Sequence, residues 1–248
     1  MELYRVALYI IFGLLPSLIW LFYYLKKDLH PEPKRMILKI FLWGVFITIP
    51  VFIIQIGLAQ LLIAVKPFAF FGHFPVITEV LKWFFIIALT EEFFKYAVVK
   101  LNVFSNKEMD EPLDIMLYMV VAALGFAAAE NILYLFSPIG NLSFDAVVQT
   151  AVVISIIRFL GATFLHTLCS ALFGYFVALS FLKARNKIKL AFTGLLLATL
   201  LHGLYNFSII NLSWPFNVSI PVLIIVGLAL FMLYDFDEIK KIKSICKL

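Results

Sequence analysis

Long uninterrupted blocks of apolar residues constrain this chain more than any other feature of its sequence. Seven such blocks occur, at about residues 4–25, 37–65, 76–99, 113–136, 147–182, 189–210 and 217–235. A helix of about twenty apolar residues spans the hydrocarbon core of a bilayer. The blocks lack the alternation over about ten residues that marks a membrane β-barrel. The sequence therefore predicts an all-α, polytopic integral membrane protein with about seven transmembrane helices.

The composition supports this fold class. Of the 248 residues, 64% are hydrophobic and 14% are charged, whereas a soluble domain is about half apolar and a quarter charged. An ordinary soluble enzyme and a disordered chain are both excluded. We expect a multi-pass protein of the cell membrane in which residues 1–248 form a single transmembrane domain. Its two cysteines, Cys169 and Cys246, are expected to be free thiols.

The positions of the basic residues predict the orientation in the membrane. Fifteen of the 20 Lys and Arg residues fall in loops or ends on one side of the seven-helix arrangement, while Arg5, Lys66 and Lys82 fall on or near the other. The positive-inside rule then places the N-terminus outside and the C-terminus in the cytoplasm. The net charge of +5 reflects topology. We expect the lipid bilayer, and no nucleic acid, as a partner.

Polar residues inside the apolar blocks indicate where function lies. They are Glu91, Glu92 and Lys95 in the third block, Glu130 in the fourth, Arg158 and His166 in the fifth, and His202 and Asn206 in the sixth. A charge near the bilayer centre costs about 2.5–3.5 kcal/mol, so such groups face one another or a water-filled cavity. We expect four helices to bring carboxylate, imidazole and amide groups to one layer.

This set of groups is suited to the activation of water. We predict Glu91 or Glu92 as the general base, helped by His166. His202 and Asn206 can donate hydrogen bonds to an oxyanion. Glu130 and Lys95 are expected to position these groups. We expect Arg158, a further supporting residue, to neutralise a carboxylate.

Four motifs in order resemble those of the PrsW intramembrane proteases. They are Glu91-Glu92-Phe-Phe-Lys95, the segment from Gly125 through Glu130 to Tyr134, the segment from Arg158 through His166 to Phe176, and His202 to Asn206. The wider superfamily includes the CAAX prenyl endopeptidases, whose second motif usually ends in His where this chain has Glu130. The resemblance implies an endopeptidase that cleaves membrane-anchored proteins, such as anti-sigma factors. It implies catalytic roles for Glu91, Glu92, Glu130, His166, His202 and Asn206.

Two other functions fit the same polar residues. A proton-coupled transporter also uses buried Glu and His relays, although transporters often show internal repeats and this sequence shows none. A non-catalytic membrane scaffold that kept the site is the second alternative. The intact acids, imidazoles and amide favour the protease.

The sequence leaves metal dependence open between two mechanisms. A glutamate–histidine mechanism without an obligatory metal is favoured, because the HExxH spacing is absent and Lys95 opposes a dication. The alternative cofactor is zinc, held by His166, His202 and a carboxylate such as Glu91.

Overall fold

The protein is an all-helical bundle in the described part of the chain. The computed structural model describes residues 3–26, 31–68, 73–106, 109, 111–136, 143–182 and 186–240. The prediction that concerns Cys246 lies outside these residues. Cys169 is a buried free thiol, as the sequence predicted.

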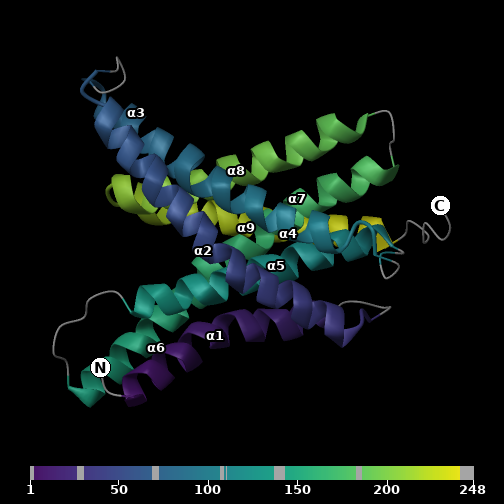
Figure 1. Ribbon diagram of the computed structural model, residues 1–248, viewed down its shortest axis with the longest axis horizontal. Coiled ribbons are helices and arrows are strands. Elements are labelled where there is room, and N and C mark those ends of the chain that lie inside the picture. Colours follow the sequence, from purple (N-terminus) through teal and green to yellow (C-terminus); the bar gives the residue numbers. More distant parts are fainter. Residues whose placement is uncertain are drawn as a thin grey trace.

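Ten helical segments follow one another in the residues that the structure describes (Figure 1). They are α1 (Leu3–Leu25), α2 (Lys34–Val65), α3 (Pro75–Val80), the π-helical segment η2 (Leu81–Leu89), α4 (Thr90–Asn102), α5 (Pro112–Leu135), α6 (Phe144–Leu160), α7 (Ala162–Leu182), α8 (Lys187–Asn211) and α9 (Phe216–Lys240). Segments α3, η2 and α4 run on without a break and form one rod. The all-α prediction is therefore confirmed.

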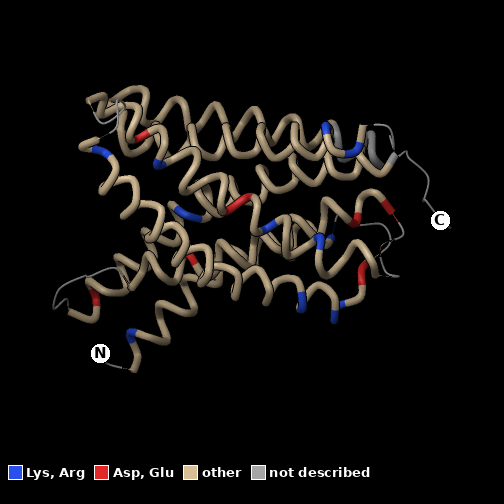
Figure 2. Tube along the Cα trace, turned by 45° about the horizontal axis from the view of Figure 1, so that its top comes forward, with Lys and Arg blue, Asp and Glu red and all other residues tan. Residues whose placement is uncertain are grey.

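Among the described residues, six segments are long and apolar enough to cross a membrane, which confirms a polytopic membrane protein. They are Leu3–Leu25, Lys34–Val65, Pro112–Leu135, Phe144–Phe181, Lys187–Asn211 and Phe216–Tyr234. The rod at 75–102 corresponds to the remaining predicted span, but it is divided into three segments and carries Glu91, Glu92 and Lys95. Figure 2 shows charged residues at both ends of the bundle and a small group at its middle.

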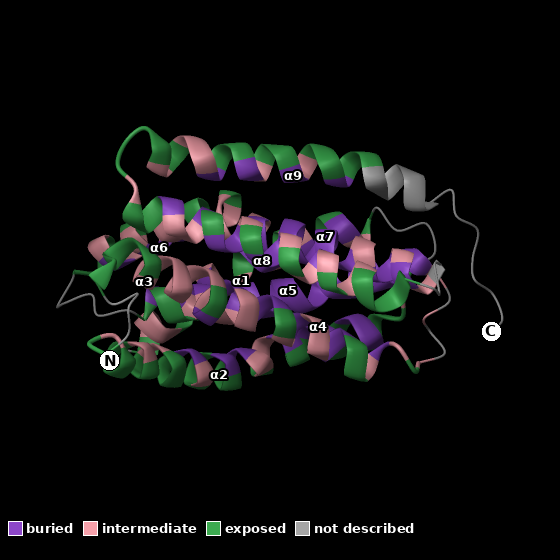
Figure 3. Ribbon diagram, turned by 90° about the horizontal axis from the view of Figure 1, so that it is seen from above, coloured by how far each residue is buried: buried purple, intermediate pink, exposed green. Residues whose placement is uncertain are grey.

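Helix α5 is the centre of the bundle. Nearly all of its residues are buried, and it packs against α1, α2, α4 and α7 (Figure 3). Helix α9 lies at the periphery with an exposed outer face, as expected for a helix that contacts lipid. Helices α1, α2, α4 and α7 are thus arranged around a buried central helix, which carries Glu130 of the polar layer.

Close contact between α2 and α5 depends on two glycines. A Cβ atom at Gly44 would collide with the carbonyl oxygen of Ala122, and one at Gly125 would collide with the carbonyl oxygen of Phe41. Small residues at such crossings let helix backbones approach closely within a membrane. This contact fixes the position of α2 relative to the centre of the bundle.

The fifth apolar block, which the sequence analysis gave as one span, breaks at Gly161. Helix α6 ends at Leu160, and α7 begins at Ala162 after a backbone turn at Gly161 with φ −102° and ψ −97°. A Cβ at this position would lie 2.6 Å from the hydroxyl oxygen of Tyr205. The break changes the direction of the chain between Arg158 on α6 and His166 on α7.

Candidate active site

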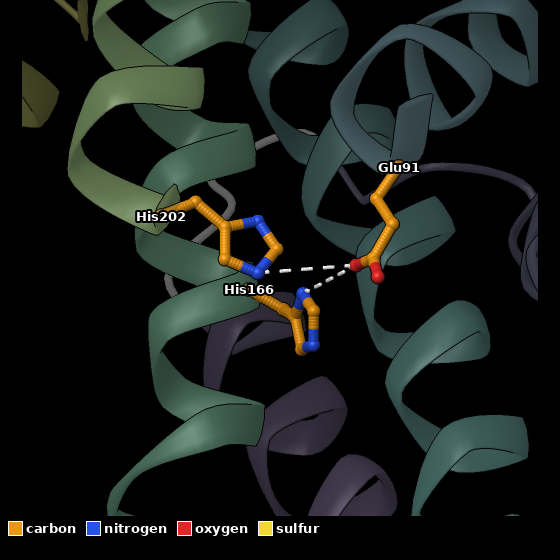
Figure 4. Close-up of side chains that lie close together, drawn as sticks. All are labelled: Glu91, His166 and His202. Atoms are coloured by element: carbon orange, nitrogen blue, oxygen red, sulfur yellow. Dashed lines mark ion pairs between the residues drawn. The ribbon is translucent and has the colours of Figure 1, made fainter. Parts of the chain in front are cut away.

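Four helices bring the predicted site residues together inside the bundle. Glu91 and Glu92 lie in the first turn of α4, Glu130 near the end of α5, His166 on α7 and His202 on α8. In Figure 4 the side chains of Glu91, His166 and His202 point toward one another from three helices. The expectation that carboxylates and imidazoles share one layer is therefore confirmed.

Glu92 is the most heavily hydrogen-bonded carboxylate of the cluster. Its Oε1 atom lies 2.8 Å from Lys95 Nζ and 2.9 Å from His202 Nδ1, and its Oε2 atom accepts a hydrogen bond of 3.1 Å from the Ser170 hydroxyl. The side chain is fully buried and does not line the neighbouring cavity. Glu92 therefore holds the surrounding side chains in place and has no free oxygen directed at a substrate.

Glu91 has the opposite environment. Its Oε1 atom accepts a hydrogen bond of 3.2 Å from the Gln55 amide, while its buried Oε2 atom has no hydrogen-bond partner among the described residues. That oxygen lies 3.9 Å from His166 Nδ1 and 3.9 Å from His202 Nε2. Glu91 also lines the cavity, so this carboxylate oxygen lies beside the cavity without a hydrogen-bond partner among the described residues.

Glu130 holds the outer side of the cluster. Its Oε2 atom lies 2.9 Å from His166 Nε2 and accepts a hydrogen bond of 2.7 Å from Arg158 Nη2. Arg158 Nε also donates to the side-chain oxygen of Asn131, and its guanidinium stacks on Tyr134 at 4.0 Å from the ring centroid. Arg158 therefore neutralises Glu130, in the supporting role that the sequence assigned to it.

The hydrogen-bond network indicates which nitrogen of each imidazole faces the centre. If His202 Nδ1 donates to Glu92, its Nε2 lone pair faces Glu91. If His166 Nε2 donates to Glu130, its Nδ1 lone pair is on the inner side, where it accepts from Lys95 Nζ at 2.8 Å and lies 3.9 Å from Glu91 Oε2. Each imidazole is thus fixed by a carboxylate on its outer side and presents a basic nitrogen on its inner side.

Lys95 pairs more closely with Glu92 than with Glu91. A spacing of four residues on a helix generally allows an ion pair, yet Lys95 Nζ lies 3.7 Å from Glu91 Oε2 and 2.8 Å from Glu92 Oε1. Its side chain is fully buried. Lys95 therefore serves mainly Glu92 and His166, and it leaves Glu91 Oε2 without a hydrogen bond.

A cavity of about 500 Å³ leads to this cluster. Its buried end is lined by Glu91, Glu130, His166 and His202. Asn206 lines the same cavity one turn beyond His202, where the sequence placed it. The rim consists of exposed apolar side chains, among them Phe52 on α2, Leu133 on α5, Ile157 on α6 and Ile209 on α8. A chain within the bilayer would therefore meet an apolar entrance and a polar interior.

Gln55 is the site residue that the sequence reasoning missed. It lies in α2, outside the four motifs, yet it hydrogen-bonds Glu91 and lines the cavity. The available signal was an amide near the middle of an apolar helix, which is costly there unless it has a partner.

The donor atoms at the centre also match a metal site. Glu91, His166 and His202 each offer one ligand atom, and these three atoms lie within 4.8 Å of one another. Two imidazoles and one carboxylate form a common catalytic zinc set, and carboxylates behind the imidazoles are typical of such sites. The unpartnered Glu91 Oε2 and the inward-facing His202 Nε2 therefore fit a divalent cation, and His166 Nδ1 would join them only if Lys95 Nζ, which lies 2.8 Å from it, moved aside.

The fold and the site together define a multi-pass membrane protein with a buried glutamate–histidine centre that opens to a cavity. Residues 32–234 match the PrsW family of intramembrane metalloproteases, and the chain belongs to this family. It is therefore a membrane-embedded protease, as the motifs indicated.

Individual relatives agree with this assignment. The chain is 28% identical over 227 residues to "Protease PrsW" of Oceanobacillus iheyensis, which covers 91% of this chain and 94% of that protein. It is 31% identical over 185 residues to the protein of the same name from Geobacillus kaustophilus, with 75% and 72% coverage. The Bacillus subtilis protein is 28% identical over 217 residues, with 86% and 87% coverage. A comparison with solved structures found no match.

Proposed function

We propose that this protein is an endopeptidase that cleaves membrane-tethered protein substrates, such as anti-sigma factors, by glutamate-assisted attack of water. The observation that carries the proposal is the unpartnered Oε2 atom of Glu91 at the buried end of the cavity, between two inward-facing imidazole nitrogens. The apolar rim of the cavity suits a substrate whose scissile segment adjoins a transmembrane helix.

In this mechanism Glu91 Oε2 accepts a proton from a water molecule while the water oxygen attacks the scissile carbonyl carbon. The Asn206 side chain, which lines the cavity, is placed to donate a hydrogen bond to the resulting oxyanion, a contribution typically worth about 2.7–4 kcal/mol. The proton then passes to the leaving amine as the C–N bond breaks. His166 and His202 relay it through nitrogens held in place by Glu130 and Glu92.

A metal-assisted form of the same reaction is the second candidate, and the donor set at the centre favours it. Glu91, His166 and His202 would hold the cation. When bound, zinc acts as a Lewis acid that polarises a carbonyl and acidifies water. Glu130 is then the carboxylate that still faces the cavity, with 24% of its side chain exposed, and it would accept the proton.

The net charge of the buried cluster affects both the metal-free and the metal-assisted mechanism. Three carboxylates and two cations in the cluster, Lys95 and Arg158, give a formal net charge of −1 with neutral imidazoles. That charge favours binding of a dication. Lys95 opposes it, because Lys95 Nζ already occupies the inner nitrogen of His166 at 2.8 Å.

The test is cleavage of a membrane-anchored reporter by the purified protein in liposomes. Wild type should cleave the reporter, and Glu91→Gln should lower the rate by about 100-fold or more, the contribution typical of a general base. Asp145→Asn, at an exposed carboxylate outside the cavity, is the matched control and should retain the wild-type rate. Substrate-independent proton flux without any cleavage would instead support a transporter.

Metal dependence is decided in the same preparation. The protein is treated with a chelator for a prolonged time, and its remaining zinc is measured by elemental analysis. If the glutamate–histidine form operates, the cleavage rate should be unchanged after this treatment. Loss of activity together with stoichiometric zinc, and recovery on zinc addition, would establish the metal-assisted form. In that form Glu130→Gln should be as damaging as Glu91→Gln, whereas in the metal-free form it should be milder.

A further inference from the structure

The packed face of α2 ends at the active site. Its buried residues Ile37, Phe41, Gly44, Thr48, Val51 and Gln55 recur every three or four positions and form one stripe along the helix. The backbone of α2 at Gly44 lies directly against the backbone of α5 at Ala122, and this contact fixes the rotation and depth of α2 relative to α5. Gln55 is the last buried residue of α2, and it lies where the stripe reaches the start of α4.

The amide of Gln55 has a defined orientation. Its Nε2 atom lies 3.2 Å from Glu91 Oε1 and 3.3 Å from the hydroxyl oxygen of Thr90. The Thr90 hydroxyl lies 2.5 Å from the carbonyl oxygen of Ile86 and 2.9 Å from that of Ile87, so its proton is directed at its own backbone. Thr90 therefore accepts from Gln55, and the amide is held with its NH₂ group toward Glu91.

Gln55 is the one side chain in the described part of the chain that hydrogen-bonds to Glu91. The neighbouring Lys95 Nζ, His166 Nδ1 and His202 Nε2 all lie at 3.7–3.9 Å from its Oε2 atom, beyond hydrogen-bond distance. With Oε1 held by the amide, the rotation of the carboxylate is fixed and Oε2 faces the two imidazoles. The orientation of the reactive oxygen thus depends on a helix that carries none of the four motifs.

We propose that Gln55 is a positioning residue for the hydrolytic reaction and acts through Glu91. This inference rests on the proposed function of Glu91, whether that carboxylate serves as base or as metal ligand. Gln55 donates one hydrogen bond to Oε1, prevents the carboxylate from rotating, and presents Oε2 to the centre. Residues that orient a reactive or ligating group typically change activity by about 10- to 100-fold when they are removed.

The test compares Gln55→Leu with wild type in the liposome cleavage assay. Leucine has a similar size but no donor, so kcat should fall about 10- to 100-fold while KM stays within about twofold. Gln60→Leu, at an exposed glutamine of the same helix that does not line the cavity, is the matched control and should behave as wild type. Melting temperatures of both variants should stay close to that of wild type.

Two further variants separate positioning from other roles. Gln55→Glu places an acceptor against Glu91 Oε1 and should be at least as slow as Gln55→Leu. In a Glu91→Gln background, Gln55→Leu should have no further effect on residual activity, because residues that act as a unit are not additive. Should Gln55→Leu fail to purify, Gln55→Asn, which withdraws the amide by one methylene, should show the same loss in kcat.

The outcomes separate this inference from the function itself. A wild-type kcat in Gln55→Leu would overturn the positioning role while the protease assignment stands. A rise in KM alone would also overturn it, since Gln55 would then contact substrate. Additive losses in the double variant would show that Gln55 acts independently of Glu91. Absence of cleavage by wild type would instead count against the proposed function.

Discussion

Removal of the Lys95 ammonium should expose how the buried charges are balanced. Lys95 is fully buried and lies 2.8 Å from Glu92, 2.8 Å from His166 and 3.7 Å from Glu91. Lys95→Met keeps the apolar part of the side chain and changes the formal net charge of the cluster from −1 to −2. Two adjacent carboxylates then lose the cation between them.

The expected loss of stability is large. Breaking a buried ion pair by removing one partner costs about 3–5 kcal/mol, because the remaining charge stays buried without compensation. For a domain of this size, 1 kcal/mol corresponds to about 2–4 °C in Tm, so Lys95→Met should melt about 6–20 °C below wild type. The four tryptophans allow thermal unfolding in detergent to be followed by intrinsic fluorescence.

Two variants control this experiment. Lys100→Met removes an exposed lysine from the same helix and should change stability by no more than about 0.5 kcal/mol. The double variant Lys95→Met with Glu92→Gln restores the net charge of −1, so it should recover much of the lost Tm but not the proteolytic activity. A Lys95→Met variant that melts within about 2 °C of wild type would refute the reasoning.

Three other predictions follow from the packing, the charges and the topology. Arg158→Met should lower the cleavage rate and reduce the free energy of unfolding by about 1.5–3 kcal/mol, because Glu130 and Asn131 lose a charged hydrogen-bond donor. A cleavage assay and chemical denaturation would measure these two effects. Gly125→Val should cost at least about 1–3 kcal/mol, because a side chain there collides with the α2 backbone; an unchanged Tm would contradict the close α2–α5 contact. In a background free of cysteine, an impermeant thiol reagent added to intact cells should label Arg5→Cys but not Lys187→Cys, and labelling at 187 would reverse the predicted orientation.

The sequence by itself determined the class of the fold and most of the site. Blocks of about twenty apolar residues dictate bilayer-length helices, since backbone groups in lipid must be satisfied within the segment. Charged groups inside those blocks are costly enough that their presence identifies a functional layer. The residues Glu91, Glu130, His166 and His202 could all be found this way.

The tertiary structure alone decided which side chain meets which. Sequence spacing could not distinguish Glu91 from Glu92. Adjacent residues point about 100° apart around a helix, and which of them faces the site depends on how the helix is rotated against its neighbours. In the fold, Glu92 faces Lys95, His202 and Ser170, while Glu91 faces the cavity. Helix spacing also could not reveal Gln55, because its partner is on another helix, 36 residues away in the chain. Hydropathy and periodicity are local properties of a segment, whereas partner choice depends on helix rotation, relative depth and the close approach of α2 to α5 at Gly44 and Gly125.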